Sequence, residues 1–503
     1  MGRAVPFLLA VAAIRCLGQD NNKPEPPPPP WQPALARIQA DSLRGHLSFL
    51  ASDLLEGRDT PSRGLEIAAH YIAAQFRRAG LEPAGDDGYF QTATFDMREP
   101  DLEGFELSFS GGDVSVRVAP DQASLFNTSG GELAGAIALR IRPELGSPLG
   151  GVTREQAQGK VLLVDFGPPS ETRPLIRSVL SVTGAASRLQ PALVILLDRG
   201  WGLARLMPRA RLIDREGPPP PQTASTVVVR DPAVAKLLDS LPAEGASLTV
   251  SARWKAPVPR PVTLRNVAGL VRGSDAALKE TAVVLSAHYD HTGMLASGEG
   301  DRIFNGANDN ASGAATVVEL ASAIASLEHK PRRSVLFLAF FGEERGLLGS
   351  RFYVRHPLVP MAKTIANLNI EQVGRTDSSE GPQLASASLT GFDYSDIGRV
   401  FAAAGERTGI RVYRHEKNND TYFSRSDNIS FARLGVPAHT LTTAYQYADY
   451  HQPGDHWEKI DCENMERVLR MIALGVLMLA DSVEAPRWNE TLPKTEPFRK
   501  ARD

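Results

Sequence analysis

Ser334-Val-Leu-Phe-Leu-Ala-Phe-Phe-Gly-Glu-Glu-Arg-Gly-Leu-Leu-Gly349 joins an apolar run to two adjacent carboxylates. The run from Ser334 to Phe341 is short and continuous, which is typical of a strand that is buried on both faces of a sheet. Glu343 and Glu344 follow at once, and like charges at the end of a buried strand repel one another. Either one carboxylate stays protonated or a cation offsets the repulsion. The stretch therefore predicts an α/β sheet with a cation site at its strand ends.

The chain from Pro261 onward alternates between strand and helix patterns. Predicted strands cover 282–286, 334–341, 365–370 and 438–442, and predicted helices cover 313–327, 347–356 and 465–479. This alternation predicts a mixed, mostly parallel central sheet flanked by helices. Near the N-terminus, apolar residues from Leu65 to Phe76 recur at three- and four-residue steps, and Gly80 follows as a helix C-cap.

Residues 120–256 have a different character from the chain on either side of them. They are rich in Gly and Pro, contain the short β-type runs 160–166, 192–197 and 226–229, and include none of the candidate ligands below. We therefore predict a β-rich inserted domain at 120–256. The main domain then has an N-terminal part at 36–119 and a catalytic part at 257–485, followed by a C-terminal tail at 486–503.

The N-terminal residues predict export. A basic start and an apolar run of about eleven residues, Ala4 to Ile14, indicate a signal peptide over 1–19, because a bilayer span needs roughly 20 apolar residues. Lipidation at Cys16 is less favoured, since Arg15 stands where a small residue is expected. We expect a secreted or periplasmic protein without a transmembrane anchor after signal cleavage. The proline-rich segment 20–35 is predicted to be an extended linker.

Composition limits the classes of function. The chain of 503 residues is 42% hydrophobic and 22% charged, an ordinary globular profile, and its net charge of -3 gives no reason to expect nucleic acid as a partner. Without the signal peptide, Cys462 is the only cysteine left, so no intrachain disulfide can form. The oligomeric state stays open.

Candidate metal ligands follow several of the predicted strands. The carboxyl ends of parallel strands meet at one edge of a sheet, so side chains placed there can share one pocket. Imidazole and carboxylate together suit zinc first, then manganese or cobalt. The candidate ligands are His288, Asp309, Glu344, Glu371 and His451.

Two metal ions close together need a bridging ligand, and one carboxylate can bind an ion through each oxygen. We assign the bridge to Asp309. One ion would then take His288 and Glu371, and the other would take Glu344 and His451.

Glu343 is left without a metal in this assignment. It can therefore act as the general base and then give the proton to the leaving amine. Asp290 follows His288 by two residues and is expected to fix the tautomer of that imidazole. The remaining histidines near these motifs, His291, His439 and His456, are expected to be structural.

Several stretches resemble the dizinc exopeptidases typified by bacterial leucyl aminopeptidase and glutamate carboxypeptidase II. This likeness implies two zinc ions, a peptide substrate, the ligands and base assigned above, and a hydrogen bond from Tyr450 to the oxyanion. The inserted segment resembles a protease-associated domain, most clearly at 159–164. The matching stretches are Leu50-Ala-Ser52, Glu56-Gly-Arg58, Ala287-His-Tyr-Asp-His-Thr-Gly293, Asn305-Gly-Ala-Asn-Asp-Asn-Ala-Ser-Gly313, Phe341-Gly-Glu-Glu344 and Tyr450-His451.

Two positions depart from that family's pattern. The family more often has Asp where this chain has Glu371, whose side chain is one methylene longer. The family's Ser-Asp-His is Ser426-Asp427-Asn428 here. Because that His is not a metal ligand in the pattern, we expect altered contacts around the site and retained activity.

The sequence favours a secreted zinc-dependent exopeptidase, most of all an aminopeptidase. A carboxypeptidase or dipeptidase on the same metal site is the alternative, with Arg375, Arg414 or Arg425 as the anchor for a free carboxylate. A catalytically inactive, receptor-like binding protein and a glutaminyl-cyclase-type transferase are further alternatives. The sequence leaves open the side-chain specificity and the role of the inserted domain.

Overall fold

The computed structural model describes residues 29–501 apart from 127–128, 144–148, 170–174, 207–209, 219–223, 243–246, 296–297 and 378–382. The predicted signal peptide at 1–19 and most of the predicted linker lie outside the described residues. Within the described part of the chain, we find no helix with the length and apolar character that a membrane span requires.

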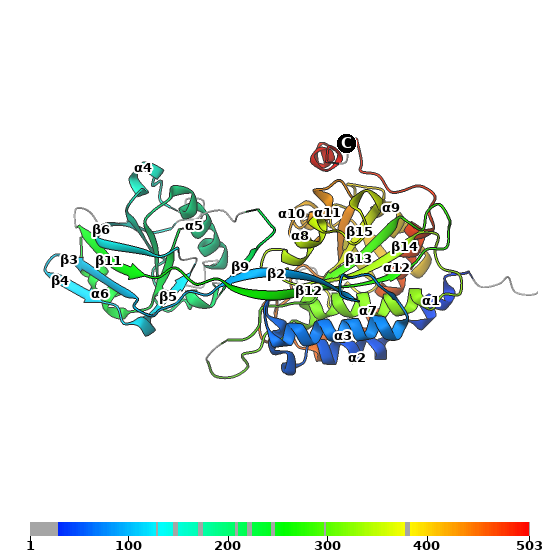
Figure 1. The fold of residues 1–503 in the computed structure, drawn as a ribbon, viewed down its shortest axis with the longest axis horizontal. Helices are drawn as coiled ribbons and strands as arrows, with labels where there is room; N and C mark the ends of the chain where they lie inside the picture. Colours follow the sequence, from blue (N-terminus) through cyan, green and yellow to red (C-terminus); the bar gives the residue numbers. More distant parts are fainter. Residues whose placement is uncertain are drawn as a thin grey trace, which may run out of the picture.

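Two sheets divide the molecule into two lobes, which the long strands β2 and β12 connect (Figure 1). We call them the ligand lobe, which contains all the candidate ligands, and the insert lobe. The sheet of the ligand lobe runs, in spatial order, through β17 (Arg411–Tyr413), β16 (Ser386–Leu389), β18 (Ala438–Thr442), β15 (Thr364–Ile370), β13 (Ala282–His288), β14 (Ser334–Phe340), β12 (Arg260–Val271), β2 (Phe90–Arg98) and β9 (Arg211–Asp214), and β1 (Glu82–Pro83) pairs with β12.

The predicted mixed α/β sheet is confirmed. Its centre, β14-β13-β15-β18, is parallel, whereas β12, β2 and β9 continue it with antiparallel pairs. The sheet is therefore parallel at its centre, but it contains more antiparallel pairs than the mostly parallel sheet that the sequence predicts. Every residue of β13, β14, β15 and β18 is buried, as their unbroken apolar character predicts. Because these strands run in one direction, their carboxyl ends form one edge.

Helices cover both faces of this sheet (Figure 1). Val283 and Leu285 of β13 pack in the larger core with the helices of one face, and Val284 packs in the smaller core of the other. The first face carries α1 (Gln32–Arg37), α2 (Ala40–Leu50), α3 (Arg63–Ala79), α7 (Ser312–Ala325), α9 (Ile397–Thr408) and α12 (Cys462–Asp481), and the second carries α8 (Leu348–Arg355) and α11 (Asn428–Ala432). The short helices α10 (Asn418–Thr421) and α13 (Glu496–Arg499) complete the lobe.

Helix α3 shows how local sequence sets the ends of an element. The side chain of Ser62 accepts a hydrogen bond from the backbone N–H of Leu65, and Gly80 ends the helix with a φ of 77°. Glycine adopts this left-handed backbone conformation easily because it has no Cβ. The apolar stripe predicted from Leu65 to Phe76 is buried.

The insert lobe has a sheet of its own. Its inner strands β6, β7, β8 and β10 are parallel, and its outer strands pair antiparallel. In spatial order the strands are β4 (Val114–Arg117), β3 (Glu106–Gly111), β11 (Leu248–Trp254), β6 (Gly131–Ile141), β7 (Val161–Asp165), β8 (Leu193–Leu197), β10 (Thr226–Val229) and β5 (Ala123–Phe126). Its helices are α4 (Arg154–Ala157), α5 (Leu175–Leu189) and α6 (Pro232–Ser240).

The structure differs from the predicted boundaries in several places. Strands β3 and β4 precede residue 120, yet they belong to the insert lobe. Residues 32–35, predicted as linker, already form α1, where Ala34 and Leu35 are buried. The predicted tail packs on the ligand lobe, because Trp488 is buried and its Nε1 donates to the Gly435 carbonyl at 2.8 Å. Boundaries depend on contacts that are distant in sequence.

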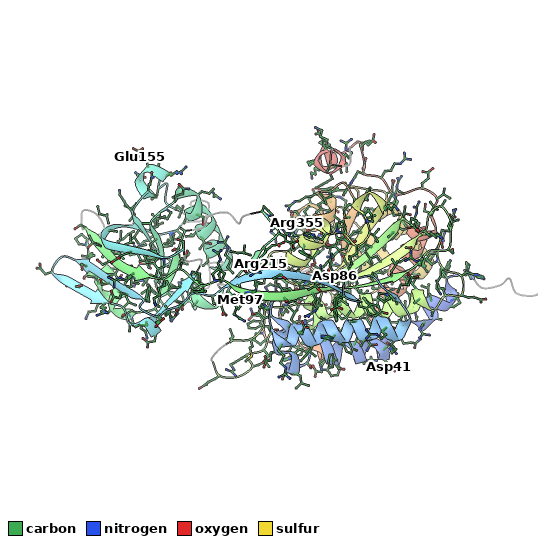
Figure 2. All side chains as sticks on the ribbon, in the orientation of Figure 1. Asp41, Asp86, Met97, Glu155, Arg215 and Arg355 are labelled. Carbon is green, nitrogen blue, oxygen red and sulfur yellow. The ribbon has the colours of Figure 1, made fainter. Side chains whose placement is uncertain are left out.

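Ion pairs hold β9 to the rest of the ligand lobe, in the region where Figure 2 shows Arg215 and Arg355. Arg215 lies 2.7 Å from Asp96 of β2, and Arg355 at the end of α8 pairs with Asp214 of β9. Strand β9 belongs by sequence to the predicted insert, but it pairs with β2 in the sheet of the ligand lobe. The insert is thus anchored by backbone pairing as well as by charge.

Candidate metal centre

The structure collects the candidate ligands at the carboxyl edge of the parallel strands. His288 is the last residue of β13, and Glu371 directly follows β15. Glu344 follows β14, and His451 lies in the loop beyond β18. Asp309 lies in the irregular turn Ala307–Ala311 that leads into α7. All five residues predicted as metal ligands therefore meet in one place.

Asp309 lies between two imidazoles. Its Oδ1 is 3.5 Å from His288 Nε2, and its Oδ2 is 3.0 Å from His451 Nε2. On one side, Glu371 Oε1 lies 3.8 Å from His288 Nε2, and on the other, Glu344 Oε1 lies 3.2 Å from His451 Nε2. The two halves are those assigned from the sequence, with one carboxylate oxygen of Asp309 facing each.

His291 also belongs to this cluster, although from its sequence we expect a structural role. Its Nδ1 lies 2.9 Å from Glu344 Oε1, and its Nε2 is buried with no hydrogen-bond partner in the described part of the chain. Ligand atoms of His291, Asp309, Glu344 and His451 all lie within 4.8 Å of one another. The sequence signal that could have identified His291 as a member of the cluster is its position three residues after His288, at the same strand end.

Glu343 is set apart from these pairs. Its side chain accepts no hydrogen bond from the described residues, whereas its backbone N–H donates to Asp290 Oδ1 at 3.1 Å. Burial raises the pKa of Glu343 well above its usual value, and the charges of Glu371 and Glu344 add to this effect against the opposing influence of His288. Of the two adjacent glutamates, this is the one with a raised affinity for a proton.

The other carboxylates and imidazoles polarise one another. Burial alone would raise the pKa of Glu344, but His451 and His291 lower it to about 2. Burial alone would lower the pKa of His451, but Glu344 and Asp309 raise it to about 11. For Glu371, burial dominates and raises the pKa to about 7. These opposed shifts are typical of a functional site.

Asp290 lies behind His288, as expected for a residue that orients the imidazole. Its Oδ1 is 3.5 Å from His288 Nδ1, its backbone carbonyl is 3.3 Å from the same nitrogen, and its Oδ2 accepts from Thr60 at 3.1 Å. Both groups are fully buried. With Nδ1 directed at Asp290, His288 presents Nε2 to Asp309 and Glu371.

Arg58 and Asp455 hold the loops that carry the ligands, and neither role was foreseen. The buried guanidinium of Arg58 donates to the carbonyls of Tyr289 at 2.8 Å, Asn305 at 2.7 Å and Gly306 at 3.0 Å. Asp455 accepts from the backbone N–H of Asn308 at 3.0 Å and of Asp309 at 3.2 Å. Glu56-Gly-Arg58 was noted only as a matching stretch, and Asp455 carried no sequence signal.

Two backbone features place side chains in the cluster. A Cβ at Gly306, whose φ is 55°, would lie 2.5 Å from the His291 ring, so only glycine allows the loop to pass there. His451 itself has a φ of 53°, which is uncommon outside glycine and concentrates at functional sites.

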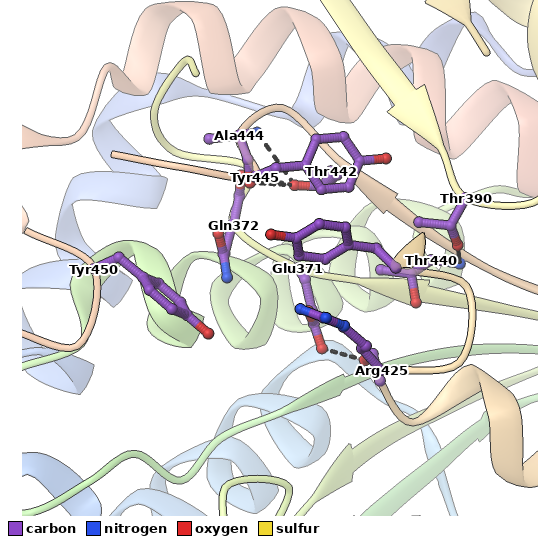
Figure 3. Close-up of a pocket in the computed structure, with 11 residues that line it drawn as sticks. Glu371, Gln372, Thr390, Arg425, Thr440, Thr442, Ala444, Tyr445 and Tyr450 are labelled. Carbon is purple, nitrogen blue, oxygen red and sulfur yellow. Dashed lines mark hydrogen bonds between the residues drawn. The ribbon is translucent and has the colours of Figure 1, made fainter. Parts of the chain in front are cut away.

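Tyr450 lies at the edge of the cluster, next to His451. The two rings stack with centroids 4.1 Å apart, and Tyr450 lines a pocket beside Glu371 (Figure 3). Burial and the charges of Asp309 and Glu344 raise the pKa of the Tyr450 hydroxyl. The hydroxyl therefore keeps its proton and can donate a hydrogen bond.

The donor set fits a zinc site. The Nε2 atoms of His291 and His451, two members of the cluster, are buried and have no hydrogen-bond partner within the described residues. Buried polar atoms without partners are costly, and a cation among imidazole and carboxylate donors would compensate them. Mixed nitrogen and oxygen donors are the ligands that zinc commonly takes.

Comparison with known proteins identifies similar chains. Residues 266–476 match the family model "Peptidase family M28". A "Probable zinc metalloprotease" of Pyrenophora tritici-repentis is 28% identical over 281 residues, 47% of this chain and 56% of that protein. "Aminopeptidase YwaD" of Bacillus subtilis is 27% identical over 240 residues, 46% of this chain and 47% of that protein. The chain spans about half the length of the curated relatives it matches.

Solved structures share the fold. An aminopeptidase from Aneurinibacillus sp. strain AM-1 matches with a TM-score of 0.59 at 20% identity, over 92% of this chain and 97% of that one. The zinc aminopeptidase BSAP from Bacillus subtilis matches with a TM-score of 0.55 at 18% identity, over 90% and 98% of the two chains. At these identities the likeness shows the fold alone.

Proposed function

Because residues 266–476 match the family model of peptidase family M28, we propose that this protein is a zinc-dependent aminopeptidase that removes N-terminal residues from peptides. One observation carries the proposal: Asp309 directs one oxygen toward His288 and the other toward His451, at 3.5 and 3.0 Å. A carboxylate placed this way suits a pair of ions.

Two zinc ions would be held on either side of Asp309. His288 and Glu371 would complete one position, and His451 and Glu344 the other. His291 is directed at Glu344 and would orient that ligand or join it. When bound, the ions polarise the scissile carbonyl and lower the pKa of the attacking water.

The remaining groups act on protons. Glu343, which is half-buried beside the cluster and pairs with no imidazole of the described residues, takes the proton of the water and delivers it to the leaving amine. The hydroxyl of Tyr450 donates a hydrogen bond to the developing oxyanion. Asp290 keeps the proton of His288 on Nδ1, so that Nε2 remains free to bind metal.

An assay with and without chelator tests the proposal. Purified protein is expected to release p-nitroaniline from unblocked amino-acid anilides, to leave N-acetylated anilides intact, and to lose the activity with a zinc chelator. Zinc analysis of the same preparation is expected to give two ions per chain. Zinc-free protein without turnover would instead support the receptor-like alternative.

A carboxypeptidase or dipeptidase remains the second candidate, because one observation favours it. Arg425 lines the pocket beside Glu371, where a free substrate carboxylate could bind. A carboxypeptidase would cleave N-blocked dipeptides with a free C-terminus, which the aminopeptidase reading excludes.

We also propose export and an identity for the insert lobe. Residues 1–19 would be removed as a signal peptide, and the mature N-terminus can be read by mass spectrometry of protein from the culture medium or periplasm. The insert lobe would be a protease-associated domain.

A further inference from the structure

A pocket opens beside the candidate metal centre, next to Glu371 (Figure 3). Three tyrosines, Tyr422, Tyr445 and Tyr450, line it together with threonines of β18. Arg425 is the one lysine or arginine among the lining residues that the structure describes. The pocket therefore joins aromatic walls to one positive charge, close to where a substrate would be cleaved.

The three arginines considered as carboxylate anchors differ in their partners. Arg375 lies 2.7 Å from Asp449, and Arg414 lies 3.4 Å from Asp393, so each is already paired within the protein. Arg425 has no carboxylate within 4.0 Å in the described part of the chain. Its guanidinium instead lies 4.8 Å from the centre of the Tyr422 ring. Of the three, only Arg425 has a charge that the described residues leave unmatched.

Neighbouring groups leave Arg425 available to a ligand. The nearest lining carboxylate, Glu371, accepts a hydrogen bond from Ser426 and is directed at His288, 3.8 Å away. Figure 3 shows the guanidinium of Arg425 and the hydroxyl of Tyr450 turned toward the space beside the Glu371 carboxylate. The cation–π contact with the Tyr422 ring restrains the guanidinium, which lowers the entropy cost of binding.

We propose that this pocket binds a carboxylate of the substrate through Arg425, so that the protein prefers N-terminal Glu or Asp. The inference rests on the proposed aminopeptidase function, because it assigns the carboxylate to the side chain of the residue that is removed. A planar guanidinium binds a carboxylate through two parallel hydrogen bonds. An uncharged amide of the same shape loses the charge-assisted part of that interaction.

Paired isosteric substrates test the inference. We expect kcat/KM for glutamyl p-nitroanilide to exceed that for glutaminyl p-nitroanilide by about tenfold to a hundredfold. Arg425→Gln should reduce this ratio to near one. Arg425→Glu should reverse the charge preference, so that lysyl p-nitroanilide becomes a better substrate than glutamyl p-nitroanilide. Arg414→Gln is the matched control, because its partner Asp393 lies outside the pocket lining. Thermal unfolding of each variant checks that the fold is retained.

A binding measurement reads the pocket without turnover. Calorimetry with free L-glutamate and L-glutamine on the wild-type protein is expected to show about tenfold tighter binding of glutamate. The difference should vanish in Arg425→Gln and persist in Arg414→Gln. Equal affinities in the wild-type protein would overturn the inference whether or not peptides are hydrolysed.

The outcomes separate the two proposals. Cleavage of unblocked anilides with equal rates for Glu and Gln overturns the carboxylate pocket and leaves the aminopeptidase. Arg425-dependent cleavage of N-acetylated dipeptides with a free C-terminus supports carboxylate binding by the pocket but overturns the aminopeptidase, because the carboxylate is then the α-carboxylate. Tighter glutamate binding with no hydrolysis of any substrate likewise supports the pocket and overturns the enzyme.

Discussion

The two lobes stabilise their buried carboxylates in different ways. In the insert lobe, Asp165 binds the guanidinium of Arg199 at 2.9 and 3.0 Å. Asp198 accepts from the backbone N–H groups of Gly200 and Gly202 at 3.1 Å and of Leu203 at 2.8 Å. Each of these carboxylates has its partners within its own lobe. No further ligand is needed to satisfy them.

The ligand lobe gathers more negative charge than it compensates. Asp309, Glu344 and Glu371 have only imidazoles as ion-pair partners, and Glu343 has no ion-pair partner among the described residues. No Lys or Arg of the described residues lies within 4.0 Å of these four carboxylates. Carboxylates that are paired within the protein indicate a structural role. A cluster of carboxylates whose negative charge the protein does not balance indicates a site for a bound cation. The predictions below test this difference.

The largest expected effect concerns Glu343. Glu343→Gln removes the group that accepts the proton of the attacking water, so kcat should fall by at least about a thousandfold. Zinc content should not change, because Glu343 is no ligand in our assignment. Steady-state kinetics and zinc analysis of one preparation measure both. Glu458→Gln, at an exposed site, is the control; a Glu343→Gln variant with substantial turnover would remove this residue from its role.

Metal content should distinguish the lobes most directly. Asp309→Asn removes the charge shared by both proposed zinc positions, so the dialysed variant should retain less than one ion per chain. Asp165→Asn changes a buried carboxylate that already has its own cation and should leave zinc content unaltered. Elemental analysis after dialysis against metal-free buffer checks both variants. Equal zinc in the two would contradict the comparison.

Substitution of Asp165, which should leave zinc content unaltered, should lower the stability of the insert lobe. Asp165→Asn leaves Arg199 with only Asp239, 2.8 Å away, so unfolding of this lobe should cost about 2 kcal/mol less, below the range for a fully broken buried pair. Urea unfolding monitored by circular dichroism measures the change. Glu132→Gln breaks the exposed pair with Arg253 and should change stability by under about 0.5 kcal/mol. Similar losses in both variants would refute the buried role of Asp165.

The smallest effect concerns His439, a buried histidine whose hydrogen-bond partners are a carbonyl and a hydroxyl. His439 Nδ1 donates to the Thr390 carbonyl at 2.8 Å, Ser395 lies 2.6 Å from its Nε2, and burial lowers its pKa to about 4. The folded protein therefore binds fewer protons here than the unfolded chain between pH 6.5 and 4. This contribution is full above pH 6.5 and is lost as the pH falls toward 4.

Unfolding at pH 7.5 and 5.5 tests this linkage. The wild-type protein should lose about 1 kcal/mol more stability over that interval than His439→Asn, which cannot titrate. Groups elsewhere contribute equally to both proteins, so the difference isolates His439. Identical pH dependence in the two would show that His439 is not held neutral.

Much of the fold followed from the sequence because its signals are local. Continuous apolar runs predicted β13, β14 and β15, and the chemistry of the residues that follow them predicted the ligands. Parallel strands bring their carboxyl ends together whatever the connecting helices are, so His288, Glu344 and Glu371 could be expected to meet. Asp309 was predicted from its glycine-rich loop ahead of the helix at 313–327, and His451 from its place in the loop after the strand at 438–442. The structure brings both to the same edge.

The tertiary structure decided what depends on distance between residues far apart in sequence. The sequence determined which side chains could bind a cation, because that depends on their chemistry and on the strand end they follow. Only the fold decided that His291 faces Glu344 and that Arg58 and Asp455 hold the ligand loops. Only the fold decided, too, that Arg375 and Arg414 have carboxylate partners while Arg425 has none among the described residues. Ion pairs and buried hydrogen bonds depend on a few ångströms between elements, and no local pattern fixes that separation.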